Sequence, residues 1–68
     1  MKEQITFRFD DEKVARSVAH HFRISGKKVK RDGNDLTVFA PFVDASAVIK
    51  SWMLKRGRVP RMIIIDWK

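Results

Sequence analysis

Cationic side chains gather near the C-terminus of this 68-residue sequence, where Lys55, Arg56, Arg58 and Arg61 share a segment with a glycine and a proline. Ammonium and guanidinium groups bind the phosphate oxygens of nucleic acids, and each contact adds to a salt-dependent affinity. The alternative interpretation is a solvated helix end, in which the same charges stabilise the last carbonyl groups and the helix dipole. We take phosphate binding as the leading hypothesis for this segment.

The other residue types that do chemistry show no catalytic or metal-binding pattern. His20 and His21 are adjacent, and neighbours on a helix point about 100° apart, so the pair is poorly placed to chelate one ion. The serines have no nucleophile-elbow motif, and the glycines have no phosphate-cradling spacing. The absence of cysteine excludes disulfides and thiolate metal sites. We therefore expect a non-catalytic protein with no metal and no cofactor.

A second set of basic residues, Lys13, Arg16, His20 and Arg23, recurs at spacings of three and four. This spacing places the four side chains on one face of a helix, opposite the apolar residues of the same segment. A basic stripe of this kind is usually the solvated side of an amphipathic helix. We assign it a function only if it is continuous with a basic end of the molecule.

Length and charge predict one small basic domain over residues 1–68. A chain of this size buries about 60% of the surface that its unfolded form exposes. The net charge of +7 favours nucleic acid or another anionic partner. No apolar run reaches the roughly 20 residues that span a bilayer, and the N-terminal residues lack the apolar core of a secretory signal. We expect a cytoplasmic protein that does not enter the membrane.

Two segments have the spacing and the end signals of helices. Val14, Val18 and Phe22 recur every four residues after three acidic residues, which favour a helix N-terminus. A second helix is predicted to begin with Asp44 as its N-cap and to end at Gly57, because glycine tolerates left-handed geometry. Each helix has an apolar side, so both are expected to pack on a sheet.

Four segments read as strands. Residues 5–9 alternate apolar and polar side chains, the period of a strand with one buried face. Two further arms flank the turn sequence Asp-Gly-Asn-Asp at 32–35 and predict a hairpin, and residues 61–68 form a final β-rich run. The resulting βαββαβ order predicts an α+β ferredoxin-like sandwich. Its four antiparallel strands are expected in the order fourth, first, third, second, with both helices on one face.

This topology places the hairpin turn at the same end of the sheet as the loop between the second helix and the last strand. The hairpin cations Lys27, Lys28, Lys30 and Arg31 are therefore expected to lie at the same end as the 55–61 cluster. Three acidic residues at the start of the first helix lie there too and offset part of the positive field. The predicted nucleic-acid site is made up of Arg8, Lys28, Lys30, Arg31, Phe39, Lys55, Arg56, Arg58 and Arg61.

The sheet face opposite the helices has two interpretations. Arg8 and Phe39 are expected on it, beside Met62 and Ile64 of the last strand. Such a face suits a stacking platform for unpaired bases. The alternative is a protein-interaction or inhibitory module that docks through this face or the edge of the last strand. A homodimer through Phe39, Met62 and Ile64 belongs to the same alternative.

The element order resembles that of RNA-recognition domains, which stack bases on aromatic side chains of their central strands. The resemblance extends to the order of elements alone. The outward positions of the first strand are Thr6 and Arg8 rather than an aromatic residue, and the third strand offers Phe39. Metal-binding domains of similar topology carry a Cys-x-x-Cys loop, and this chain has no cysteine.

Overall fold

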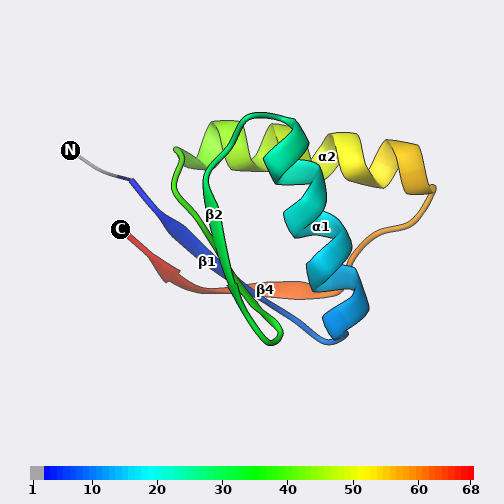
Figure 1. Ribbon diagram of the computed structural model, residues 1–68, viewed down its shortest axis with the longest axis horizontal. Coiled ribbons are helices and arrows are strands. Elements are labelled where there is room, and N and C mark those ends of the chain that lie inside the picture. The colour runs from blue at the N-terminus through cyan, green and yellow to red at the C-terminus, as the bar shows by residue number, and fades with distance from the viewer. Residues whose placement is uncertain (1–2) are drawn as a thin grey trace.

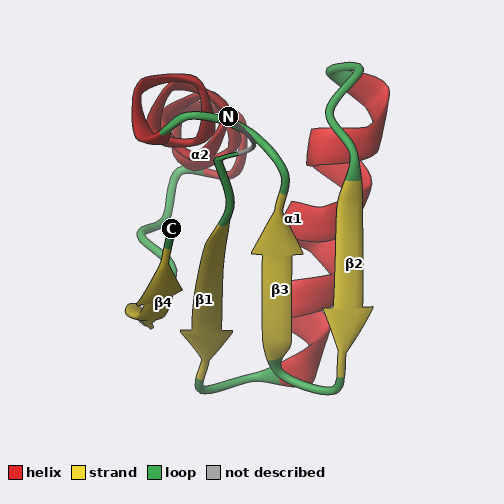
Figure 2. Ribbon diagram, turned by 90° about the vertical axis from the view of Figure 1, so that its left-hand side faces the viewer, coloured by secondary structure: helices red, strands yellow, loops and turns green. Residues whose placement is uncertain are grey.

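The computed structural model describes residues 3–68 and contains the six predicted elements in the predicted order (Figure 1). The strands form one antiparallel sheet in the order β2-β3-β1-β4 (Figure 2). This is the α+β ferredoxin-like sandwich that the sequence predicts. The elements are β1 (Ile5–Phe9), α1 (Glu12–Ile24), β2 (Val29–Asp32), β3 (Asp35–Val38), α2 (Phe42–Arg56) and β4 (Met62–Trp67).

The alternation in β1 decides which side of the sheet is buried. Ile5, Phe7 and Phe9 are at most 2% exposed and face the helices, while Thr6 and Arg8 face the opposite side. Pairing with β3 matches buried residues with buried residues, because directly opposed side chains share a face. The apolar core therefore lies between this face of the sheet and the two helices.

The helix ends are defined by local geometry. Asp11 caps α1, and its side chain accepts a hydrogen bond of 2.8 Å from the backbone N–H of Lys13. The helix α2 begins earlier than predicted, with Pro41 at its N-cap and Asp44 inside its first turn. Proline suits such a start because its fixed φ fits the extended residue before a helix. Gly57 ends α2 with φ at 66°, and its N–H donates to the carbonyl of Met53 at 2.8 Å.

The two helices cover the sheet unequally. Figure 2 shows α1 behind β3 and β2, whereas α2 is seen nearly end-on towards the β1 and β4 side. The helix α2 crosses α1 steeply instead of running beside it (Figure 1). The indole Nε1–H of Trp52 donates to Ser17 Oγ at 2.9 Å and joins the helices where they meet. Trp52 is 3% exposed, as expected of a core residue.

The prediction that Met62 and Ile64 lie on the open face is wrong. Met62 pairs with Phe9 and Ile64 pairs with Phe7, so both side chains share the helix-covered side. Ile63 pairs with Arg8 and takes the open side instead. A register shift follows Ile64, and Ile65 has no partner on β1. An extra residue of this kind is typical of a β-bulge, which re-aims the side chains after it.

No helix within residues 3–68 has the length and apolar character required to cross a membrane.

Candidate nucleic-acid interface

Three segments meet at one end of the sheet, as the topology predicts. The N–H of Phe9 donates to the carbonyl of Asn34 in the hairpin turn at 2.9 Å. The N–H of Asp10, the next residue, donates to the carbonyl of Arg61 in the α2–β4 loop at 3.2 Å. The junction between β1 and α1 is thus held between the hairpin turn and the basic loop.

The cations of this end form a cluster that we call the basic end. Lys13, Arg56 and Arg58 line one surface hollow of about 230 Å³ between the start of α1 and the end of α2. Arg61 lines a second hollow with Arg8, beside the end of β1. Within residues 3–68, none of the basic-end side chains has a carboxylate within 4.0 Å. The basic end consists of Lys13, Lys55, Arg56, Arg58 and Arg61.

Lys13 was not among the predicted site residues. It begins the basic stripe of α1, and the shared hollow makes that stripe continuous with the α2–β4 loop. Continuity with a basic end was the condition for assigning the stripe a function. Asp11 also lines the hollow and caps α1, so the first amides of α1 already have an acceptor. Cationic side chains rather than helix amides are therefore the groups that this hollow offers to an anion.

The hairpin cations do not all converge on this end, which corrects the sequence prediction. Lys27 forms an ion pair of 3.7 Å with Asp44 at the start of α2, at the opposite end of the sheet. Lys28 lies there too, since its carbonyl accepts from the N–H of Phe39, just after β3. The reason is chain direction, because β2 runs from these lysines towards the turn. Residues before a strand and residues after it lie at opposite ends.

The two remaining hairpin cations lie on different faces of β2. Arg31 pairs with buried Leu36, so it lies on the helix side of this edge strand. Its Nη1 donates to the carbonyl of Gly33 at 2.8 Å and braces the turn. Lys30 pairs with Thr37 and lies on the open face, exposed. Lys30 and Arg31 therefore do not present a common surface.

Arg8 is engaged by a carboxylate on the open face. Its Nε and Nη2 donate to the two carboxylate oxygens of Asp35 at 2.9 and 3.2 Å. This hydrogen-bonded pair lowers the pKa of Asp35 and raises the pKa of Arg8. A phosphate at Arg8 would have to compete with a bidentate partner that is already in place.

The open face has a polar centre. Thr6 and Thr37 join their hydroxyl groups at 2.9 Å across the central strand pair. Phe39 follows β3 and is 41% exposed. It is the one aromatic side chain on the open side of β1 and β3. It lies at the Lys28 end, away from the basic end. The face thus offers one stacking position rather than a row of them.

One of the two histidines, His21, forms a contact between the helices. His21 Nε2 lies 3.3 Å from Ser51 Oγ on α2. In the part of the chain that the structure describes, no three His, Asp or Glu side chains are close enough to hold a metal ion.

Comparisons with known proteins leave the function open. No protein-family model, no curated protein and no solved structure matches this chain. The ferredoxin-like architecture hosts many unrelated activities, so the fold by itself does not assign one. Function is therefore inferred from the surfaces of the molecule.

Proposed function

We propose that this protein is a small non-catalytic module that binds nucleic acid through the basic end. The observation that supports the proposal is a group of five cations around one loop, free of carboxylate partners within 4.0 Å among residues 3–68. Unpaired cations keep their full attraction for phosphate, whereas paired cations must first give up a partner.

The geometry favours contact with the phosphate backbone rather than with bases. Lys13, Arg56 and Arg58 surround a shallow hollow, and Arg61 continues the positive surface towards the end of β1. Recognition of a base sequence requires side chains that reach base edges or stack on bases. The single exposed aromatic side chain of the open face, Phe39, lies at the end of the sheet away from the basic end. We therefore expect binding with little sequence preference and a steep dependence on salt.

The test is a titration of short single- and double-stranded oligonucleotides at two salt concentrations, followed by NMR and by fluorescence anisotropy. The double variant Arg58→Ala/Arg61→Ala removes two loop cations that are both exposed and outside the core. We expect weaker binding to every sequence and a salt slope, log K against log of salt concentration, that is lower by about two.

A matched control removes the same charge elsewhere. Lys28→Ala/Lys30→Ala also lowers the net charge by two, but its positions lie on β2 and just before it, away from the basic end. We expect this control to bind nearly as well as the wild-type chain. Equal losses in the two double variants would show that overall charge and not the basic end attracts the ligand. No binding of any oligonucleotide at low salt would overturn the proposal.

A further inference from the structure

The side of the molecule that carries β4 exposes apolar surface along a sheet edge. The strand β4 is the last in the sheet order, so one side of its backbone has no neighbouring strand. Ile63 is 62% exposed and Trp67 is 58% exposed, and Ile65 adds a third exposed apolar side chain. Edge strands of soluble proteins are usually short, or carry charges or proline that prevent pairing with another chain. Asp66 is the one charged residue of β4.

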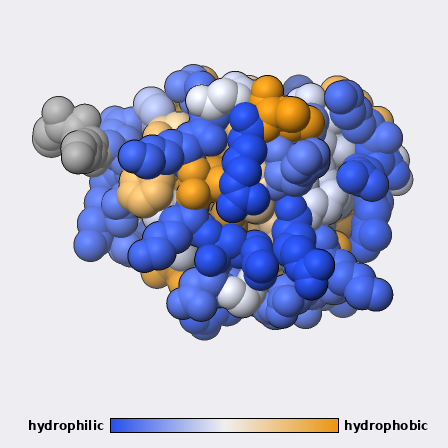
Figure 3. All heavy atoms as spheres, in the orientation of Figure 1, coloured by the Kyte–Doolittle hydropathy of each residue, from blue (hydrophilic) through white to orange (hydrophobic). Residues whose placement is uncertain are grey.

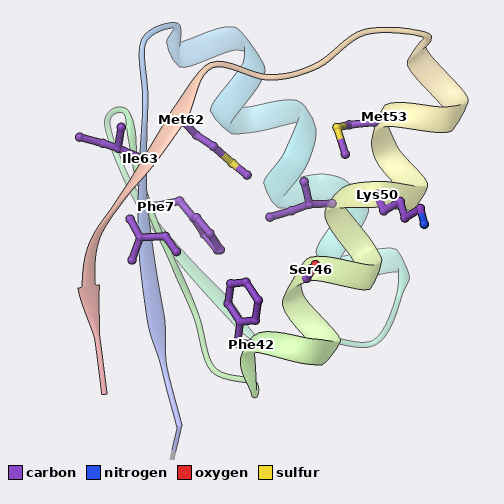
Figure 4. A pocket seen from close by; sticks show the side chains of 9 residues that line it. Phe7, Phe42, Ser46, Lys50, Met53, Met62 and Ile63 are labelled. Carbon is purple, nitrogen blue, oxygen red and sulfur yellow. The ribbon is translucent and has the colours of Figure 1, made fainter.

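An apolar groove runs directly beside this edge, because α2 stands away from β4. Its volume is about 620 Å³. Figure 4 shows Phe7 and Met62 of the sheet pointing towards α2, and Phe42 and Met53 of α2 pointing towards the sheet, while Ile63 points away. The groove is lined mainly by Phe7, Phe42, Ile49, Met53, Met62 and Ile64.

An aromatic pair lies beside the groove, and one of its rings, Phe42, lines the groove. Phe42, the first residue of α2, stacks on Trp67, the last residue of β4, with ring centroids 4.9 Å apart and planes 26° apart. Both rings stay substantially exposed, at 40% and 58%. Phe42 thus belongs to both the groove and the aromatic pair, and it joins the groove to the exposed ring of Trp67 on β4.

The charges at the two ends of β4 indicate what pairs with it. Arg61 precedes the strand, and Asp66 lies near its end, 3.9 Å from the ammonium group of Lys68, which offsets part of its negative charge. When two copies of β4 lie antiparallel, the Arg61 end of each copy meets the Asp66 end of the other, and the isoleucines meet at the centre. A parallel arrangement would bring the two Arg61 side chains together, and like charges directly opposite each other are destabilising. We propose that β4 pairs antiparallel with β4 of a second copy of this chain, which forms a two-fold symmetric dimer.

A symmetric dimer also covers both exposed features of this side, the unpaired edge of β4 and the apolar groove beside it. The two sheets become one continuous sheet, and each β4 supplies the hydrogen-bonding edge that the other lacks. With the two-fold axis perpendicular to the sheet, both helical layers lie on one side, so the two grooves merge into one apolar layer between the two α2 helices. The contact closes on itself and leaves no further copy of β4 to add, which prevents open-ended assembly.

The dimer seam, which is the contact between the two β4 strands and the grooves beside them, shares Arg61 with the basic end and is otherwise a separate surface. The strand β4 begins at the basic end, so antiparallel pairing directs the two basic ends in opposite directions along the seam. Salt therefore distinguishes the two proposals. Screening reduces repulsion between two chains that each carry +7 and favours the dimer, whereas the same salt weakens binding of nucleic acid.

The test measures mass by sedimentation equilibrium from micromolar to millimolar protein. We expect the wild-type chain to reach twice its monomer mass of 8.0 kDa. The variant Ile63→Lys places a charge on the exposed edge, outside the core, and should raise the dissociation constant at least tenfold. The matched control is Ile24→Lys, which puts the same charge on a side chain with a similar exposure of 65%, at the end of α1. It should dimerise like the wild-type chain.

Each outcome decides for or against the seam. A wild-type chain that stays monomeric at millimolar concentration overturns the proposal, as does an Ile63→Lys variant that is folded by circular dichroism and still dimerises fully. If the variant does not fold, isotope-filtered NMR on mixed labelled and unlabelled wild-type chains decides. Intermolecular contacts between the two β4 strands support the seam, and contacts confined to other elements overturn it.

Discussion

The two edge strands of the sheet, β2 and β4, differ in how readily each could pair with a strand of another chain. The strand β2 has four residues, of which Lys30, Arg31 and Asp32 are charged, and α1 covers its helix side. Figure 3 looks onto this side of the molecule and shows a largely hydrophilic surface. The strand β4 has six residues and one charge, and α2 stands away from it across a groove. The first edge resists pairing with another chain, and the second is suited to it.

This difference shows how helix placement determines which surface stays exposed. A helix that lies along a sheet buries the edge strand's inner side chains and leaves charges outside. A helix that crosses steeply, as α2 does, packs on its fellow helix and leaves the last strand half covered. The apolar surface of β4 therefore results from the angle of α2 as much as from the composition of β4.

The largest expected effect compares a core position of α1 with the exposed aromatic pair between α2 and β4. Phe22 of α1 is 0% exposed, so Phe22→Ala should lower the free energy of unfolding by about 3–5 kcal/mol. Phe42 of α2 is 40% exposed, and Phe42→Ala should cost about 1 kcal/mol, chiefly the stacking on Trp67. Urea denaturation of both variants measures the two costs. Equal costs would show that the Phe42–Trp67 pair beside the groove contributes as much to stability as the core.

The second largest expected effect is on dimer formation, and it compares the edge strands β2 and β4 directly. Ile63→Lys gives β4 the kind of charged side chain that Lys30 supplies on β2. The tenfold weakening expected for the dimer follows from the added charge and from the loss of an isoleucine at the seam, whereas the fold should persist because Ile63 is not part of the core. Sedimentation of this variant beside Ile24→Lys decides whether edge composition controls pairing.

A smaller effect is expected from Lys13, which joins the basic stripe of α1 to the α2–β4 loop. Loss of one phosphate contact should lower the salt slope of nucleic-acid binding by about one, so Lys13→Ala should weaken binding several-fold at low salt. Lys28→Ala, at the other end of the sheet, is the control of equal charge. Anisotropy titrations at two salt concentrations compare the two. If Lys13→Ala and Lys28→Ala bind equally well, the shared hollow has no part in binding.

The topology could be predicted from the sequence because local patterns agree with one another. The alternation of Ile5, Phe7 and Phe9 assigns the buried face of β1, and the turn at 32–35 fixes the hairpin. In β4 four apolar residues follow in a row, so alternation cannot assign a face. Pairing with β1 and the shift after Ile64 assign it instead, and both depend on tertiary contacts.

The candidate site was less predictable than the fold. The topology placed the whole hairpin at one end of the sheet, but Lys28 and Arg31 are separated along an extended strand by roughly 10 Å, at about 3.3 Å per residue. Lys13 was overlooked because the crossing of the helices, which brings it to Arg56 and Arg58, leaves no mark in the local pattern.

The smallest effect concerns Arg8 and Asp35 on the open face between the two edges. Arg8 lowers the folded-state pKa of Asp35 below its ordinary value of 3.8. The pair therefore stabilises the fold above that ordinary value, and the contribution is lost as pH falls through the lowered pKa. Asp35→Asn should be slightly less stable than the wild-type chain at pH 7 and equally stable near pH 2. Thermal melts of both proteins across this range measure the difference. The difference in stability between the two proteins should disappear at low pH because protonation removes the charge of Asp35. A difference that stays constant down to pH 2 would show that this charge does not stabilise the fold.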